Sequence, residues 1–195
     1  ITESTDTIIA LDGADNAKIE NLNLQRSRGT GLEIKNSNGV QILDCKVEYM
    51  GRYGIFADNV TNTMIDGCEV SNISKGGIYV NYKNYHDPDL ILQNNSIQNC
   101  NVYNIGTENF IAGAVYLGGT GNKISHNTVH NTPHMAIWFD GNDNTVEYNE
   151  IYNAVKYCDD AGVIYSNAGM CGYGNTVQYN YIHDWPSLNP YVSEL

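Results

Sequence analysis

The sequence is poor in charged residues, and above all in basic ones. Charged side chains make up 16% of the 195 residues, with 10 Lys and Arg against 22 Asp and Glu, so the formal net charge is −12. Binding to nucleic acid requires a basic surface that neutralises phosphates, and we therefore expect no nucleic-acid partner. The same balance disfavours an acidic polysaccharide unless a bound cation offsets the repulsion. It leaves neutral sugars, cations and basic partners open.

The sequence also lacks a long apolar run and a Cys-x-x-Cys pair. A membrane-spanning helix needs about 20 consecutive apolar residues, so we expect no membrane span. Structural zinc sites commonly use closely spaced cysteines, so we expect no zinc centre. We also expect no cofactor, with room only for a structural or substrate-bridging calcium ion. Abundant Gly, Asn and Tyr indicate a chain rich in strands and turns.

A six-residue pattern that begins and ends with an apolar residue occurs seven times. Its first residues are spaced 23, 23, 27, 32, 22 and 31 positions apart: Ile19, Ile42, Ile65, Leu92, Ile124, Val146 and Val177. A period near 23 with longer excursions indicates a solenoid whose coils carry insertions. We expect these insertions near residues 82–89, 101–112, 154–161 and 166–174.

Each coil also carries a short run, led by Gly or Ala, in which side chains alternate inward and outward as in a strand. The runs are Gly31–Ile34, Gly54–Ala57, Gly77–Val80, Ala114–Leu117, Ala136–Phe139 and Gly162–Tyr165. Asn recurs at corners, as in Val70-Ser-Asn72 and Val129-His-Asn131. Stacked Asn side chains bond one another and the turn backbone, which satisfies polar groups that the corners bury.

These patterns resemble the right-handed parallel β-helix of the pectate-lyase-like superfamily over residues 17–185. The resemblance implies an all-β solenoid of about seven coils with Asn-lined corners. We expect residues 1–195 to form a single domain, and because Ile1 stands so close to a coil, we expect a piece of a longer solenoid. The resemblance implies no single activity, since such helices serve lyases, glycosidases, epimerases, adhesins and stalks.

One outward row of the short runs is rich in aromatic side chains. The row consists of Glu33, Phe56, Tyr79, Tyr116, Trp138 and Ile164. Neighbouring exposed rings are unfavourable unless they are covered or used, and coils rise ~4.8 Å each, close to the length of one sugar unit. We therefore predict that Phe56, Tyr79, Tyr116 and Trp138 bind a polysaccharide or oligosaccharide. The alternative is that the insertions fold over the rings and bury them.

Titratable groups gather near the same row. Stacking places His134 and Asp160 on adjacent coils, with Asp159 beside Asp160 and with Asp140 two residues after Trp138. Paired carboxyl groups, one acid and one base or nucleophile, are what glycoside hydrolysis needs. We predict Asp160 as nucleophile or base, Asp159 or Asp140 as its partner, and His134 as the group that holds or shares the proton. The alternative is that Asp159 and Asp160 cap a turn or bind a structural cation.

Residues 122–185 are also similar to β-helix proteins linked to glycoside hydrolases of the fucosidase and xylosidase kind. The similarity lies in Pro133–Asp143, Val146–Ile151, Asp159–Tyr165 and Tyr179–Asp184. In those proteins the Asp-Asp-Ala-Gly stretch lies at the active site, which implies that Asp159 or Asp160 is a catalytic carboxylate. Their pattern continues into a further coil with more carboxylates. If the second catalytic group belongs to that coil, this chain holds half a site.

We therefore predict a secreted or cell-surface carbohydrate-active β-helix, a glycoside hydrolase of neutral polysaccharide. One alternative is a non-catalytic carbohydrate-binding or adhesin segment, and a second is a polysaccharide lyase. A lyase commonly uses Arg or Lys as its base, but Arg26, Arg28 and Arg52 lie far from Asp159 and Asp160 along the solenoid, which argues against a lyase. A calcium-dependent lyase at Arg52, Asp58 and Lys75 stays open.

The five cysteines leave their pairing open. Cys45 and Cys68 hold the same place in consecutive coils, about one strand spacing of ~4.8 Å apart, which permits a disulfide. Buried free thiols in one row are the alternative. Cys158 and Cys171 fall in two insertions around one coil, where they are placed to pair, whereas Cys100 has no evident mate.

Overall fold

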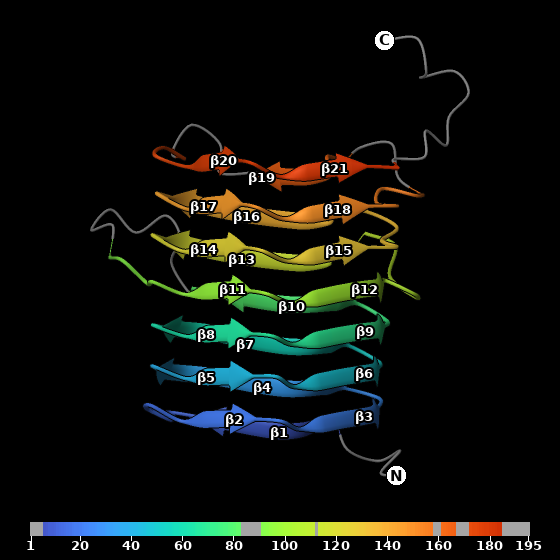
Figure 1. The fold of residues 1–195 in the computed structure, drawn as a ribbon. Helices are drawn as coiled ribbons and strands as arrows, with labels where there is room; N and C mark the ends of the chain where they lie inside the picture. Colours follow the sequence, from blue (N-terminus) through green and yellow to red (C-terminus); the bar gives the residue numbers. More distant parts are fainter. Residues whose placement is uncertain (1–5, 83–90, 112, 158–160, 167–171, 185–195) are drawn as a thin grey trace, which may run out of the picture.

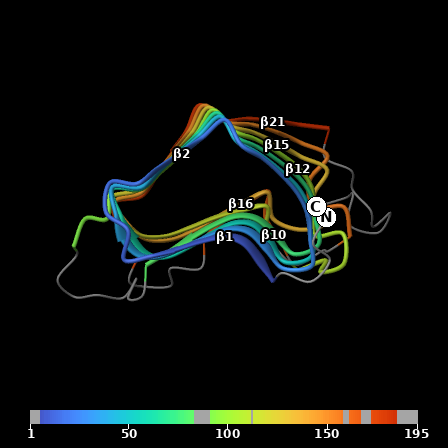
Figure 2. The same ribbon diagram turned by 90° about the horizontal axis from the view of Figure 1, so that it is seen from below.

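The computed structural model describes residues 6–82, 91–111, 113–157, 161–166 and 172–184. Within these ranges the chain forms a solenoid of parallel strands and contains no helix (Figure 1). The strands stack into three sheets of seven, which confirms the all-β solenoid and the predicted number of repeats. Viewed along its axis, the solenoid has a roughly triangular outline with one sheet on each side (Figure 2). No helix long and apolar enough to cross a membrane occurs in these ranges.

The first sheet holds the longest strands and positions the candidate site. Its strands are β1 (Thr7–Asp12), β4 (Thr30–Asn38), β7 (Tyr53–Thr61), β10 (Gly76–Asn81), β13 (Val115–Thr120), β16 (Ile137–Asn142) and β19 (Ile164–Ser166). The predicted runs fall on these strands because their apolar members alternate toward the core. Leu32, Ile55 and Ile78, for example, are in register and fully buried.

The second and third sheets close the triangle. The second consists of β2 (Lys18–Glu20), β5 (Gln41–Leu43), β8 (Met64–Asp66), β11 (Ser96–Gln98), β14 (Lys123–Ser125), β17 (Thr145–Glu147) and β20 (Thr176–Gln178). The third consists of β3 (Asn23–Ser27), β6 (Lys46–Met50), β9 (Glu69–Ile73), β12 (Asn101–Ile105), β15 (Thr128–His130), β18 (Glu150–Tyr152) and β21 (Tyr181–His183). Residues 101–105, predicted to begin an insertion, are therefore a strand, and the excursion begins at Gly106.

Left-handed residues turn the chain at the same point of every coil. Between the second and third sheets these are Asn21, Asp44, Gly67, Asn99, His126, Tyr148 and Tyr179, with φ between 50° and 67°. A second row near the ends of the third-sheet strands consists of Arg26, Tyr49, Asn72, Asn104, Asn131, Asn153 and Asp184, with φ between 49° and 62°. Gly, Asn and Asp occupy many of these positions because they tolerate this conformation best.

Asn ladders run through the interior, as predicted. In one of them the side-chain oxygens of Asn127 and Asn149 accept the backbone N–H of the preceding coil, from Cys100 at 2.9 Å and from Asn127 at 3.0 Å. The Asn127 Nδ2 donates to the Ile97 carbonyl at 3.0 Å. A parallel ladder links Asn95, Asn122, Asn144 and Asn175 by the same type of bond. The ladders satisfy backbone donors that the corners withdraw from water.

The fourth repeat begins five residues later than predicted. Ile97, not Leu92, pairs with Ile65 on one side and with Ile124 on the other. The segment from Leu92 has the same apolar–polar spacing as a true repeat, but Leu92 itself is 56% exposed and precedes the strand.

The corrected alignment puts Cys100 in the row of Cys45 and Cys68, and Cys100 is unpaired, as expected. All three are buried free thiols, which supports the alternative to a Cys45–Cys68 disulfide. Burial raises the pKa of the Cys45 thiol. Cys158 and Cys171 lie outside the described residues.

Candidate functional site

The predicted aromatic row exists on the outer face of the first sheet. Parallel pairing places Phe56 beside Tyr79, Tyr79 beside Tyr116, and Tyr116 beside Trp138. The end of the row differs from the prediction, because Trp138 pairs with Tyr165 and Ile164 pairs with Ile137. The last strand is thus shifted by one residue, which exchanges the faces of its side chains. A fifth aromatic ring therefore extends the row.

The rings stack mainly on one another. Phe56 and Tyr79 have centroids 5.3 Å apart and planes 9° apart, and for Tyr79 and Tyr116 the values are 4.3 Å and 19°. Trp138 breaks the stack, since its plane stands at 73° to Tyr116 and at 78° to Tyr165. Tyr116 is only 4% exposed, whereas Phe56, Tyr79 and Trp138 are partly exposed. Trp138 thus presents a partly exposed ring whose plane lies across the stack.

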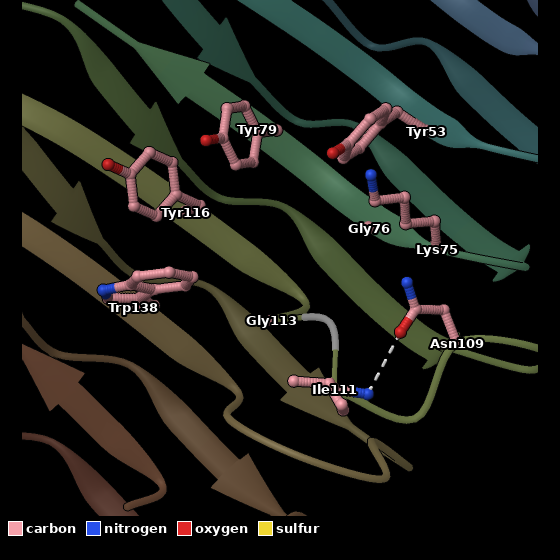
Figure 3. Close-up of a pocket in the computed structure, with 9 residues that line it drawn as sticks. All are labelled: Tyr53, Lys75, Gly76, Tyr79, Asn109, Ile111, Gly113, Tyr116 and Trp138. Carbon is pink, nitrogen blue, oxygen red and sulfur yellow. Dashed lines mark hydrogen bonds between the residues drawn. The ribbon is translucent and has the colours of Figure 1, made fainter. Parts of the chain in front are cut away.

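A hollow of about 240 Å³ opens over this row. We call it the aromatic hollow; it is lined by Tyr53, Lys75, Gly76, Tyr79, Asn109, Ile111, Gly113, Tyr116 and Trp138. Figure 3 shows the four rings in an arc, with Asn109 and Ile111 on the opposite side. No Asp or Glu is among these described lining residues.

One wall of the aromatic hollow is the segment 106–111, which joins β12 toward β13. The backbone N–H of Asn109 donates to the Ser74 carbonyl at 3.0 Å, and the Asn109 side chain accepts from the N–H of Ile111 at 3.2 Å. These bonds hold Asn109 and Ile111 at the rim. In its described part, the predicted 101–112 insertion thus forms a wall beside the rings and leaves the hollow open.

Tyr53 and Lys75 also line the hollow, and the sequence reasoning missed them as binding residues. The Tyr53 ring lies 5.0 Å from Phe56 and 5.4 Å from Tyr79, and the Lys75 Nζ stands 4.9 Å from the Tyr53 ring centroid. Such a cation–π contact stabilises an ammonium group while leaving it near the surface. The available signal was Tyr53 itself, an aromatic residue just before a predicted strand.

A polar row runs beside the aromatic one on the first sheet. Lys35 pairs with Asp58, Asp58 with Asn81, and Gly118 with Asp140. The Asn81 Nδ2 donates to Asp58 Oδ1 at 3.0 Å. The next strand does not continue this row after Asp140, since the one-residue shift in β19 pairs Ser166 with Phe139.

Gly118 makes room in this row for the hydroxyl of Tyr116. A Cβ at Gly118 would lie 2.6 Å from Tyr116 Oη and 3.2 Å from Asn81 Oδ1. Asp140 neighbours Gly118 on the next strand and is only 5% exposed. The Tyr116 hydroxyl and the Asn81 carboxamide thus lie over Gly118, and Asp140 is the neighbour of Gly118 on the next strand.

Of the other predicted catalytic residues, only His134 lies within the described residues. His134 precedes β16, is 7% exposed, and its carbonyl accepts from Thr132 Oγ1 at 2.9 Å and from the Val155 N–H at 3.2 Å. Within the described residues, the buried His134 Nδ1 and Trp138 Nε1 have no hydrogen-bond partner. Orphaned buried polar atoms cost about 1–3 kcal/mol each. The two unpaired nitrogens thus lower stability, and hydrophobic packing gives no reason for polar atoms at these positions.

Asp159 and Asp160 lie outside the described residues, so the predicted carboxyl pairs that involve them stay predictions. His134 and Asp140 stand on either side of Trp138 along the chain. Among the described side chains, no group of three His, Cys, Asp or Glu is arranged to hold a metal ion.

A family model for the right-handed β-helix region matches residues 1–138. A solved structure titled as a glycoside hydrolase superposes with a TM-score of 0.61 at 18% identity, and covers 80% of this chain and 32% of its own. The siphovirus 9NA tailspike receptor-binding domain reaches 0.47 at 11% identity, covering 92% and 47%, respectively. An alginate lyase from Paenibacillus sp. str. FPU-7 reaches 0.42 at 13% identity, covering 90% of each chain.

At these identities the likeness to solved structures concerns the fold alone. The chain spans about a third of the length of the glycoside hydrolase structure and about half of the tailspike domain. The comparison with curated proteins finds no match.

Proposed function

This chain belongs to the right-handed β-helix family, and we propose that it is a carbohydrate-active member that binds and hydrolyses a neutral glycan on its first sheet. The observation that carries the proposal is the aromatic hollow, where rings, a carboxamide and an ammonium group line one opening of about 240 Å³. Because the substrate that we propose is a glycan outside the cell, we also propose a location in the extracellular space or on the cell surface.

The lining suits a sugar chain because sugars present both apolar C–H faces and hydroxyl groups. Trp138 and Tyr53 offer aromatic surface, Lys75 offers an ammonium group beside the Tyr53 ring, and Asn109 offers a carboxamide at the opposite rim. Binding sites of this kind combine apolar walls with a few placed polar groups. The net charge of −12 favours a neutral chain over a densely acidic one.

We assign hydrolysis to a pair of carboxyl groups that includes Asp140. One group protonates the leaving oxygen of the glycosidic bond, and the other attacks the sugar or activates water. Support for Asp140 comes from its burial and from its place on the strand next to Gly118, over which the Tyr116 hydroxyl lies. Asp160 or Asp159 is its proposed partner, and His134 would hold or share the proton. This chemistry requires no cofactor.

Turnover of a panel of neutral oligosaccharides by the full chain tests the proposal. We expect Asp140→Asn and Asp160→Asn to lower turnover by about 10²-fold or more while binding is retained. Trp138→Ala should weaken binding. Tyr148→Ala is the matched control, since Tyr148 is an exposed aromatic residue at a corner between the other two sheets. Unchanged turnover in both Asp variants would refute the assignment of the carboxyl groups.

A non-catalytic glycan-binding module is the second candidate. It is favoured by the absence of any carboxylate among the described residues that line the aromatic hollow. In that case the wild type would bind oligosaccharides without cleaving them. Trp138→Ala would then weaken binding, and Asp140→Asn would change nothing.

A further inference from the structure

A second groove lies on the other side of the segment 106–111, along the corner between the third and first sheets. It consists of two hollows of about 470 Å³ and 450 Å³ that share Asn72 and Thr107 as lining residues. We call their union the corner groove. Asn109 and Ile111 face the aromatic hollow, whereas Thr107 and Phe110 line the corner groove, so one segment separates two distinct openings.

The corner groove follows the solenoid axis. It begins at Arg28, directly after β3, and reaches Lys156, shortly after β18. These two strands are five steps apart in the third sheet. Five strand spacings of ~4.8 Å amount to about 24 Å. Because one spacing is close to the length of a sugar unit, the groove fits an oligosaccharide of about five units laid parallel to the axis.

The groove is lined by a row of carboxamides at the pitch of the coils. The Nδ2 of Asn104 donates to Asn72 Oδ1 at 3.1 Å, and the Nδ2 of Asn131 donates to Asn104 Oδ1 at 3.2 Å. Each carboxamide nitrogen carries two hydrogens and each oxygen two lone pairs. The bonds within the row use one hydrogen of each nitrogen, so donors and acceptors remain for the hydroxyl groups of a ligand.

A cation marks each end of the corner groove. Lys156 Nζ donates to Asn131 Oδ1 at 3.2 Å, and Arg28 is exposed at the opposite end. Neither forms an ion pair within the part of the chain that the structure describes. By contrast, four lysines elsewhere pair with glutamates: Lys18, Lys35, Lys46 and Lys123. In a chain of charge −12, no Asp or Glu is among the described residues lining the groove.

Exposed aromatic rings accompany the two cations. Tyr49, 52% exposed, lines the Arg28 end, and Phe110 and Tyr157, 52% and 68% exposed, line the Lys156 end. Phe110 and Tyr157 meet edge to face with centroids 5.7 Å apart. The rings provide apolar contact for a sugar, and the neighbouring cations provide charge for an acidic substituent on that sugar.

We propose that the corner groove binds a sparsely acidic glycan, a neutral sugar chain with carboxylate substituents about five units apart, held at Arg28 and Lys156. The strands that precede Arg28 and Lys156 are five spacings apart, and the Lys156 side chain reaches back to Asn131 on the preceding coil. The two charges are therefore about four to five sugar lengths apart, which matches such spacing. A dense polyanion would bring further charges to positions where the groove offers only carboxamides. It would also meet the repulsion of the net charge of −12. This site is separate from the aromatic hollow and needs no catalysis.

Titration calorimetry with the full chain tests the proposal. The probe is a neutral hexasaccharide with one glucuronic acid substituent near each end, compared with the unsubstituted hexasaccharide and with hexagalacturonate. We expect Arg28→Gln and Lys156→Gln each to weaken binding of the substituted probe about tenfold, the loss of one charge-assisted contact. Lys18→Gln and Lys123→Gln remove the same charge elsewhere and should leave binding unchanged.

Two further readouts separate this site from the first-sheet site. Trp138→Ala should leave binding of the substituted probe at the corner groove intact, whatever it does to turnover. In the wild type, raising the salt concentration should weaken binding of the substituted probe more than that of the unsubstituted one. Equal affinity for the two hexasaccharides, tighter binding of hexagalacturonate, or unchanged binding in both groove variants would overturn the proposal.

Discussion

At the residue scale, one stack of rings shows how position along the solenoid sets the chemistry of a side chain. On the third sheet, Tyr103, His130, Tyr152 and His183 stack with centroids 4.9, 4.5 and 5.1 Å apart. Burial lowers the pKa of His130. At the last coil, hydrogen bonding to Asp184, and secondarily to Glu150, raises the pKa of His183. Two histidines in the same row thus have pKa values shifted in opposite directions.

His183 predicts a pH dependence of stability. Because its pKa is raised on folding, its contribution is fully present below the unfolded pKa, near the usual 6.5, and is lost as the pH rises through the folded value. We expect the difference in Tm between wild type and His183→Gln to be larger at about pH 5.5 than at pH 8. His126→Gln serves as the control, since His126 is exposed and also stacks on a Tyr. A difference independent of pH would contradict the ionic role and leave only stacking.

At the element scale, the interior Asn ladders connect the coils where strands end. Asn127 links three repeats. Its side-chain oxygen accepts from the Cys100 N–H and its Nδ2 donates to the Ile97 carbonyl, while its backbone N–H and its Nδ2 both donate to the side-chain oxygen of Asn149. Removing one partner of a hydrogen bond buried at a corner costs more free energy than forming the bond contributes, because the remaining partner has neither its bond nor water. The ladder therefore explains why Asn, and no apolar residue, fills this row in the later coils.

Removing one ladder residue should destabilise the chain strongly. Asn127→Ala leaves the backbone N–H of Cys100 buried without its acceptor, and we expect a loss of about 2–3 kcal/mol in the free energy of unfolding. Asn101→Ala, an exposed strand position in the same region, should change it by less than about 0.5 kcal/mol. Denaturant unfolding measures both variants. Equal losses would show that the ladder bonds contribute little.

Sequence periodicity predicted the elements well and their exact register less well. The rows through Phe56, Tyr79, Tyr116 and Trp138 were predictable because consecutive coils repeat the same alternation. The fourth repeat was misplaced because the segment from Leu92 imitates the pattern by chance. The other error is the one-residue shift of β19. In both cases a predicted insertion precedes the strand, and the length of the insertion hides the register.

The candidate site was predictable only where it lies on strands. Trp138 and Asp140 follow from the repeat, whereas Asn109 and Ile111 reach the aromatic hollow through the fold of the segment 106–111. Their position depends on backbone bonds to Ser74, a contact between residues far apart in sequence. Periodicity carries no information on such contacts. Tyr53 and Lys75 were missed because they precede the strand that the repeat defines.

At the scale of the whole molecule, the solenoid provides two parallel openings on either side of one segment. The aromatic hollow lies over the first sheet and the corner groove over the adjacent corner, and both run across several coils. A stacked fold suits extended ligands because each coil repeats its surface at ~4.8 Å. The arrangement leads us to propose a protein with two separate glycan sites, one aromatic and one cationic.

The measurement that tests the central claim most directly is a crystal structure of the Asp140→Asn variant with a neutral hexasaccharide. Our account predicts a sugar ring packed against Trp138 in the aromatic hollow, with hydroxyl groups near Asn109 and with the glycosidic oxygen within reach of residue 140. A hexasaccharide bound elsewhere on the solenoid, with the aromatic hollow empty, would contradict the assignment of this hollow as the glycan site.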